Sequence, residues 1–123
     1  MTSSQKKILV IEDEKPLARA LELKLNHAGF DAKSVSNGEE GLSLLQNENY
    51  SLAICDLMMP QMDGFTLLKK LKDMNIKTPI IILTNLSQAE DEKRAHDLGA
   101  AGFFIKSNTP VTEIVERVKQ KVG

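Results

Sequence analysis

Cysteine is nearly absent from the sequence, which carries only Cys55 among its 123 residues. No internal disulfide can form, and nothing in the cysteine content requires an oxidising compartment. Long hydrophobic runs are absent too, because no stretch approaches the roughly 20 apolar residues of a membrane-spanning helix. The polar start, MTSSQKK, lacks the apolar segment of a secretion signal. These absences predict a cytoplasmic chain that does not enter a membrane.

An excess of charge of either sign is also missing, since 16 basic residues face 17 acidic ones and the formal net charge is -1. Such a chain has no large field for wrapping nucleic acid. We therefore expect protein partners and no direct binding of nucleic acid. The length fits one hydrophobic core, so we expect a single domain over residues 1–123, with residues 1–6 a frayed lead-in.

Short β-branched runs alternate with longer amphipathic stretches five times along the chain. The alternation predicts an α/β fold, a doubly wound five-stranded parallel sheet of order 2-1-3-4-5 in a flavodoxin-like (βα)5 three-layer sandwich. The predicted strands are Lys7–Ile11, Asp31–Val35, Leu52–Cys55, Pro79–Leu83 and Gly102–Ile105. The first, third and fourth are apolar enough to be covered on both faces, which indicates the central strands of a parallel sheet.

The helices between these strands show helical spacing and recognisable ends. Leucines at 17, 21 and 25 mark one buried face, and Gly29 is typical of a helix stop. Asn37 and Asp63 are side chains that cap helix starts. The helix predicted over Gln88–Leu98 is rich in alternating charge, so we expect it to be the most exposed.

Polar residues follow four of the predicted strands. They are Glu12, Asp13 and Glu14 after the first strand, Asp56 after the third, Thr84 after the fourth and Lys106 after the fifth. The carboxyl ends of parallel strands lie at one edge of the sheet, where ligands bind in this architecture. We therefore expect these side chains to meet.

Converging carboxylates repel one another unless a cation neutralises them. Oxygen ligands with room for water suit Mg²⁺, whereas zinc would need His and Cys ligands that are not found here. His27 and His96 fall on helices and are predicted to be surface residues. Asp56 can then act as a nucleophile toward phosphorus, with Lys106 and Mg²⁺ opposing the developing charge and the Thr84 hydroxyl bonding a phosphoryl oxygen.

Four segments, VIEDE, ICDLMMPQMDG, IIILTN and GAAGFFIKS, together resemble the receiver domain of two-component response regulators over nearly the whole chain. The resemblance implies a phosphorylation switch, not an enzyme, that takes its phosphoryl group from a sensor histidine kinase or phosphotransfer protein. It further implies Glu12, Asp13, Asp56 and the Met58 carbonyl as ligands of Mg²⁺. Thr84 and Phe103 would be the switch pair and Lys106 the phosphate-sensing lysine.

Phosphorylation is then expected to draw Thr84 and Lys106 toward Asp56 and to admit Phe103 into the vacated space. The remodelled surface would comprise the helix at 88–98, the strand at 102–105 and the last helix. A downstream protein, or a second copy in a homodimer, would bind there.

Three residues depart from the family pattern. Ser107 stands where proline usually forms a cis bond, so the Lys106–Ser107 peptide is either cis, at about 2.5–4 kcal/mol, or trans with the loop rebuilt. Asn85 replaces a small residue and is predicted to alter dephosphorylation. Phe103 replaces the commoner tyrosine, and both an inward and an outward rotamer of its ring are compatible with the sequence.

Three other functions compete with the phosphorylation switch. A phosphatase with an aspartyl nucleophile needs a second acid two residues later, where Met58 stands. A flavodoxin-like cofactor binder needs a phosphate loop after the first strand, where acidic residues would repel phosphate. A degenerate receiver that binds partners without phosphorylation is the strongest rival, suggested by Ser107 and Asn85.

Overall fold

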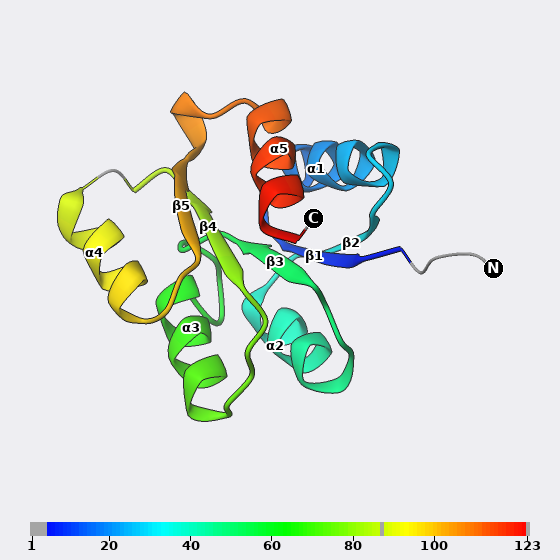
Figure 1. The fold of residues 1–123 in the computed structure, drawn as a ribbon. Coiled ribbons are helices and arrows are strands. Elements are labelled where there is room, and N and C mark those ends of the chain that lie inside the picture. The colour runs from blue at the N-terminus through cyan, green and yellow to red at the C-terminus, as the bar shows by residue number, and fades with distance from the viewer. Residues whose placement is uncertain (1–4, 87, 123) are drawn as a thin grey trace.

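A computed structural model describes residues 5–86 and 88–122 (Figure 1). Five parallel strands form one sheet in the order β2-β1-β3-β4-β5. They are β1 (Lys7–Ile11), β2 (Asp31–Val35), β3 (Leu52–Cys55), β4 (Ile80–Thr84) and β5 (Gly102–Ile105). The predicted fold class and strand order are confirmed. Residues 1–4 of the predicted lead-in lie outside the described residues, while the Lys6 carbonyl accepts a hydrogen bond from Asp31 N at 2.9 Å.

One strand boundary was predicted wrongly. The fourth strand was expected over Pro79–Leu83, but β4 runs from Ile80 to Thr84. Proline has no amide hydrogen to donate to the ladder, and only its carbonyl takes part, accepting from Ala53 N at 2.9 Å. Thr84 is instead the last ladder residue and pairs with Ile105.

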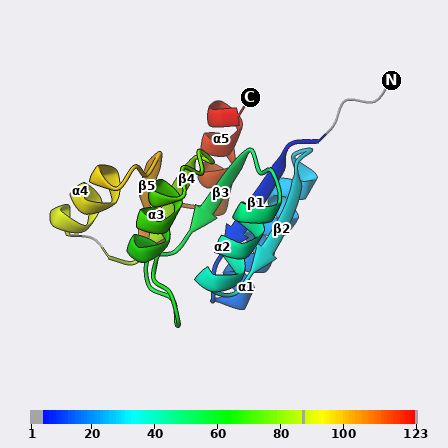
Figure 2. The same ribbon diagram turned by 90° about the horizontal axis from the view of Figure 1, so that it is seen from below.

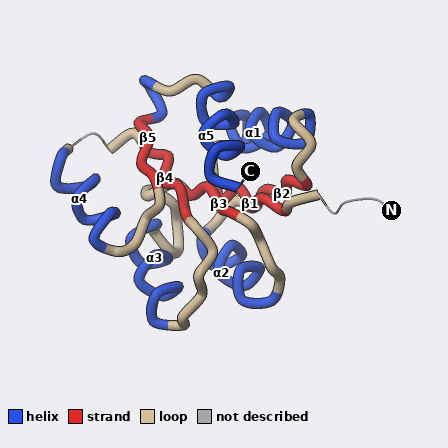
Figure 3. The backbone as a smooth tube through the Cα atoms, in the orientation of Figure 1, coloured by secondary structure: helices blue, strands red, loops and turns tan. Residues whose placement is uncertain are grey.

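Helices cover both faces of the sheet. They are α1 (Lys15–His27), α2 (Gly38–Asn47), α3 (Gly64–Asp73), α4 (Ala89–Asp97) and α5 (Val111–Val122), with a short 3₁₀ turn, η1 (Lys106–Asn108), after β5. Helices α1 and α5 lie on one face and α2 and α3 on the other, as the ribbon and tube views show (Figures 1 and 3). Helix α4 lies beyond β5 in two perpendicular views (Figure 2). No described helix has the length and apolarity to cross a membrane.

The hydrophobic core has two halves, one on each face of the sheet. Alternate residues of β1 serve the two halves: Ile8 and Val10 pack with α1 and α5, while Leu9 and Ile11 pack with α2 and α3. All four side chains are fully buried. A parallel strand covered on both faces requires this continuous apolar run, which explains why β1 could be identified from the sequence.

The predicted helix ends are found where the capping residues stand. Asn37 Oδ1 accepts a hydrogen bond from Glu40 N at 2.9 Å and starts α2. Asp63 Oδ1 accepts from Thr66 N at 2.8 Å and starts α3. Gly29 follows α1 with φ 101, a conformation that side chains disfavour.

Helix α4 is the least buried of the five helices. Ala95 is the one residue of α4 that is fully enclosed. The expectation that the charged helix near 88–98 is the most exposed is confirmed, although α4 begins and ends one residue inside the predicted range.

Candidate functional site

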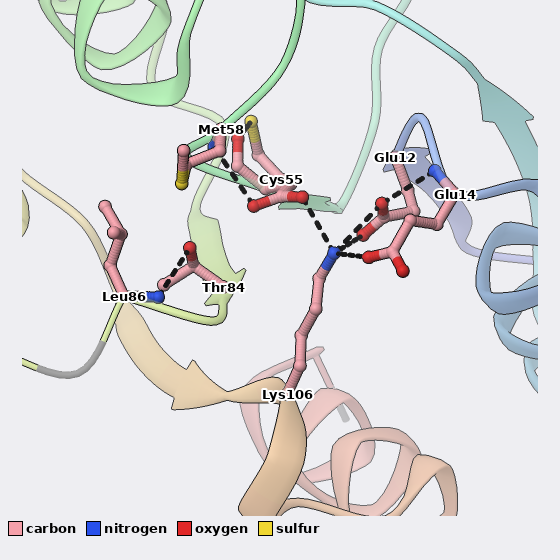
Figure 4. Close-up of polar contacts among 8 residues, drawn as sticks. Glu12, Glu14, Cys55, Met58, Thr84, Leu86 and Lys106 are labelled. Carbon is pink, nitrogen blue, oxygen red and sulfur yellow. Dashed lines mark hydrogen bonds and ion pairs between the residues drawn. The ribbon is translucent and has the colours of Figure 1, made fainter.

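The predicted residues meet at one edge of the sheet because parallel strands deliver their carboxyl ends there. Glu12 follows β1, Asp56 follows β3, and Lys106 follows β5. Lys106 extends from the end of β5 across the sheet edge toward Glu12 and Glu14 (Figure 4). Residues separated by 94 positions along the chain are thus hydrogen-bonded neighbours.

Ion pairs hold the Lys106 ammonium at the centre of this edge. Its Nζ lies 2.8 Å from Asp56 Oδ2 and 2.9 Å from Glu12 Oε1, and it also contacts the Glu14 carboxylate. The side chains of Glu12, Asp56 and Lys106 are 2%, 4% and 9% exposed. Buried charges require such pairing, because an unpaired one would be strongly destabilising.

Glu12, Asp13 and Asp56 form an acidic cluster that is a candidate cation site. One carboxylate oxygen from each lies within 4.8 Å of the others. Among the described residues, Glu12 Oε1 is buried without an aligned hydrogen bond, despite the nearby ammonium. An under-satisfied buried oxygen in an all-oxygen cluster fits a hard divalent cation such as Mg²⁺.

Burial and hydrogen bonding shift the pKa values of Glu12 and Lys106. Desolvation raises the pKa of Glu12 to about 7, and hydrogen bonds from the Glu14 amide and from Lys106 only partly offset it. The pKa of Lys106 is lowered by burial but raised further by its hydrogen bonds to Asp56, Glu14 and Glu12, so the net shift is upward. The ammonium form of Lys106 is thus stabilised.

The loop after β3 fixes the Asp56 carboxylate. Asp56 Oδ1 accepts a hydrogen bond from Met58 N at 3.1 Å, while Oδ2 faces Lys106. Gly64 packs so closely that a Cβ there would lie 2.7 Å from the Asp56 carbonyl oxygen. The loop therefore needs glycine at this point, and the start of α3 is held against the aspartate. The predicted use of the Met58 carbonyl as a ligand stays a prediction.

The predicted switch pair lies beside the cluster on one face of the sheet. Thr84 is fully buried, and its hydroxyl oxygen accepts a hydrogen bond from Leu86 N at 3.3 Å. Phe103 pairs with Ile82 across the ladder and is half-buried against the core beneath α2, α3 and α4. The hydrogen bond from the Leu86 amide to Thr84 was not expected, and no sequence signal marked it.

The departures from the family pattern have local structural outcomes. The Lys106–Ser107 peptide is trans, which is the second of the two predicted geometries. The loop that begins there forms the 3₁₀ turn η1. Asn85 is exposed directly after Thr84. His27 and His96 are exposed, as predicted.

Glu14 is a residue of the site whose role the sequence did not reveal. It was recognised as part of the acidic end of the first strand, but without a function of its own. A long, exposed side chain next to two acidic residues gives no sequence signal for its partner. Only the folded chain brings it to Lys106.

Comparison with known proteins agrees with this geometry. The response regulator receiver domain family matches residues 8–119. The chain is 38% identical over 115 residues to the probable transcriptional regulator ycf27 of Porphyridium aerugineum, covering 94% of this chain and 47% of that protein. It is 34% identical over 114 residues to the alkaline phosphatase synthesis transcriptional regulatory protein PhoP of Bacillus subtilis, with 93% and 47% covered.

A solved structure shows the same fold. The receiver domain of Francisella response regulator 1452 superposes with a TM-score of 0.91 at 33% identity, covering 96% of this chain and 97% of that one.

The chain belongs to the response regulator receiver domain family. Receiver domains are signalling switches of two-component systems rather than conventional enzymes, and the predicted family and its non-enzymatic class are confirmed. They generally bind Mg²⁺ at an acidic pocket and work with histidine kinases or phosphotransfer proteins. The chain spans about half the length of the curated relatives that it matches.

Proposed function

We propose that this chain is a phosphorylation switch that accepts a phosphoryl group on Asp56 in a Mg²⁺-dependent reaction. The donor is the phosphohistidine of a sensor histidine kinase or of a phosphotransfer protein, encountered in the cytoplasm. The observation that carries the proposal is the buried ion pair between Lys106 and Asp56 beside Glu12 and Asp13. A buried nucleophilic carboxylate with a cation on either side is suited to phosphoryl transfer.

The transfer forms one bond and breaks one. An oxygen of Asp56 bonds to phosphorus as the bond from phosphorus to the donor imidazole nitrogen breaks, and the electron pair leaves with that nitrogen. Glu12, Asp13, Asp56 and the Met58 carbonyl would hold Mg²⁺, which would supply positive charge against the phosphoryl oxygens. The Met58 amide, already bonded to Asp56 Oδ1, orients the carboxylate.

Lys106 and Thr84 then bind the new phosphoryl group. The Lys106 ammonium exchanges a carboxylate partner for a phosphoryl oxygen, since both are anionic acceptors. The Thr84 hydroxyl leaves the Leu86 amide for another phosphoryl oxygen, and Phe103 moves into the space. Shifting a two-state population from 1:99 to 99:1 takes about 5.5 kcal/mol, which a few charge-assisted hydrogen bonds approach.

The output is a change in the surface formed by α4, β5 and α5. A downstream protein, or a second copy of this chain in a homodimer, binds this surface. Helix α4 supports the proposal because it is weakly buried, with Asp91, Glu92, Lys93 and Arg94 able to set partner choice. Relatives of this chain are named as transcriptional regulators.

Intact-mass measurement after incubation with phosphoramidate and Mg²⁺ tests the proposal. The native chain is expected to gain one phosphoryl group, and Asp56→Asn none. Asp63→Asn is the matched control, because asparagine also caps a helix, and it should gain the group as the native chain does. A native chain that folds but gains nothing would instead support a degenerate receiver that binds partners without phosphorylation, the alternative suggested by Ser107 and Asn85.

A further inference from the structure

Glu14 stands at the start of α1 but does not cap it. It occupies the N-cap position with extended backbone angles, φ -80 and ψ 102, and its side chain makes no capping hydrogen bond. Acidic side chains at helix starts normally bond the free amides or interact with the helix dipole. Here the carboxylate turns instead to the Lys106 ammonium.

Two overlapping groups of carboxylates share this edge of the sheet. The candidate cation site uses Glu12, Asp13 and Asp56. The Lys106 ammonium contacts Glu12, Glu14 and Asp56. Glu14 is therefore the lysine partner that lies outside the candidate cation site.

The position of Glu14 outside the candidate cation site becomes important once a divalent cation is bound. A cation held by Glu12 and Asp56 would repel the ammonium that contacts the same two side chains. Glu14 still offers that ammonium a carboxylate. Its side chain is 55% exposed, so it can follow the lysine without breaking any buried contact.

We propose that Glu14 is a positioning residue that retains Lys106 in the unphosphorylated chain and competes with the phosphoryl group for it. The inference rests on the proposed phosphorylation of Asp56 and adds a restraint on that reaction. The Glu14 amide donates to Glu12 Oε2 at 2.9 Å, which fixes the backbone from which the carboxylate reaches Lys106. Phosphoryl transfer must then draw Lys106 away from Glu14.

The restraint is modest because the pair is partly exposed. Exposed ion pairs contribute about 0.2–1 kcal/mol, so removing the carboxylate should speed transfer roughly 1.4- to fivefold. Salt should weaken the restraint, since charges are screened beyond about 3 Å at 1 M ionic strength.

The test compares Glu14→Gln with the native chain in phosphoramidate and saturating Mg²⁺, following phosphoryl gain by intact mass. Glu14→Gln should react roughly 1.4- to fivefold faster at low salt, and the difference should disappear near 1 M salt. Asp63→Asn removes one charge near the site without touching Lys106 and controls for repulsion of the anionic donor. Equal acceleration by both variants, or no acceleration by Glu14→Gln, overturns the inference.

A double-mutant cycle supplies a readout that does not depend on phosphorylation. Urea unfolding without Mg²⁺ is measured for the native chain, Glu14→Gln, Lys106→Met and the double variant. A coupling between Glu14 and Lys106 supports the contact, and additive effects reject it. A native chain that takes no phosphoryl group rejects the proposed function itself, whereas a reactive native chain with an unchanged Glu14→Gln rejects only the restraint.

Discussion

Helices α1 and α4 border opposite ends of the same sheet but are attached to it very differently. Helix α1 buries Ala18, Leu21 and Leu25 and also hydrogen-bonds to β2. Helix α4 buries Ala95, and the Arg94 guanidinium lies 4.1 Å from the centre of the Phe65 ring. Helix α1 is held by three buried apolar side chains together with polar bonds, whereas α4 has one buried side chain and a partly exposed contact.

The polar bonds of α1 close the free edge of the sheet. Asn26 Oδ1 accepts from Ala32 N at 2.8 Å, and Glu22 Oε2 accepts from Ser34 N at 2.9 Å. Both amides lie on the side of β2 that faces away from β1. Without these bonds, this strand edge would be open to pairing with another chain. The β2 end of the sheet is therefore expected to be rigid. Helix α4 is expected to move at a small cost in free energy, as regions with few buried contacts do.

Removing a buried apolar side chain from α1 should lower the free energy of unfolding more than a change at the β2 edge or in α4. Leu25→Ala is expected to lower the free energy of unfolding by about 2–5 kcal/mol, because Leu25 is fully buried and its loss leaves a cavity. Leu23→Ala on the same helix is the control, since Leu23 is 56% exposed, and should change stability by less than about 0.5 kcal/mol. Urea unfolding measures both, and similar losses would contradict the assignment of the buried face.

Removing the Asn26 hydrogen bonds at the β2 edge should lower the free energy of unfolding by an intermediate amount. Asn26→Ala deletes both bonds to Ala32 and leaves the part-buried Ala32 amide without its side-chain acceptor, so a loss of about 1–2 kcal/mol is expected in urea unfolding. Asn47→Ala is the matched control, because the exposed Asn47 side chain donates a long hydrogen bond to the Ser43 hydroxyl, at 3.5 Å. If the two alanine variants were equally stable, the Asn26 bonds would contribute nothing.

The smallest effect is expected at α4. Arg94→Gln removes the contact with Phe65, which is worth about 0.5–1 kcal/mol at an exposed site. Amide exchange in α4 should therefore speed up roughly two- to fivefold while exchange in α1 stays unchanged. Lys93→Gln breaks only the exposed pair with Asp97 and should change α4 exchange less. Slower exchange in α4 than in α1 in the native chain would reverse the contrast altogether.

Much of the fold could be predicted because its signals are local. The apolar run of β1, the caps Asn37 and Asp63, and the charged α4 each appear in a short stretch of sequence. The start of β4 was misjudged because Pro79 continues the apolar run, and only the hydrogen-bond ladder shows that it contributes a carbonyl alone. Strand ends were enough to predict that Glu12, Asp13, Asp56 and Lys106 meet.

The remaining features of the site depend on contacts that no local pattern encodes. The Met58 amide on Asp56 and the Leu86 amide on Thr84 arise from loop conformations after β3 and β4. The pKa of Glu12 is raised to about 7 by burial, which follows from packing against elements far away in the chain.

By itself, the sequence determined the order of strands and helices, which faces are apolar, and which edge of the sheet receives the acidic and basic side chains. Those properties follow from periodicity and from the direction of parallel strands. Only the tertiary structure decided which carboxylates share Lys106, and that the exposed Glu14 is one of them. The physical reason is that a long flexible side chain has many rotamers, and its partner is selected by the distances between strands brought together in folding.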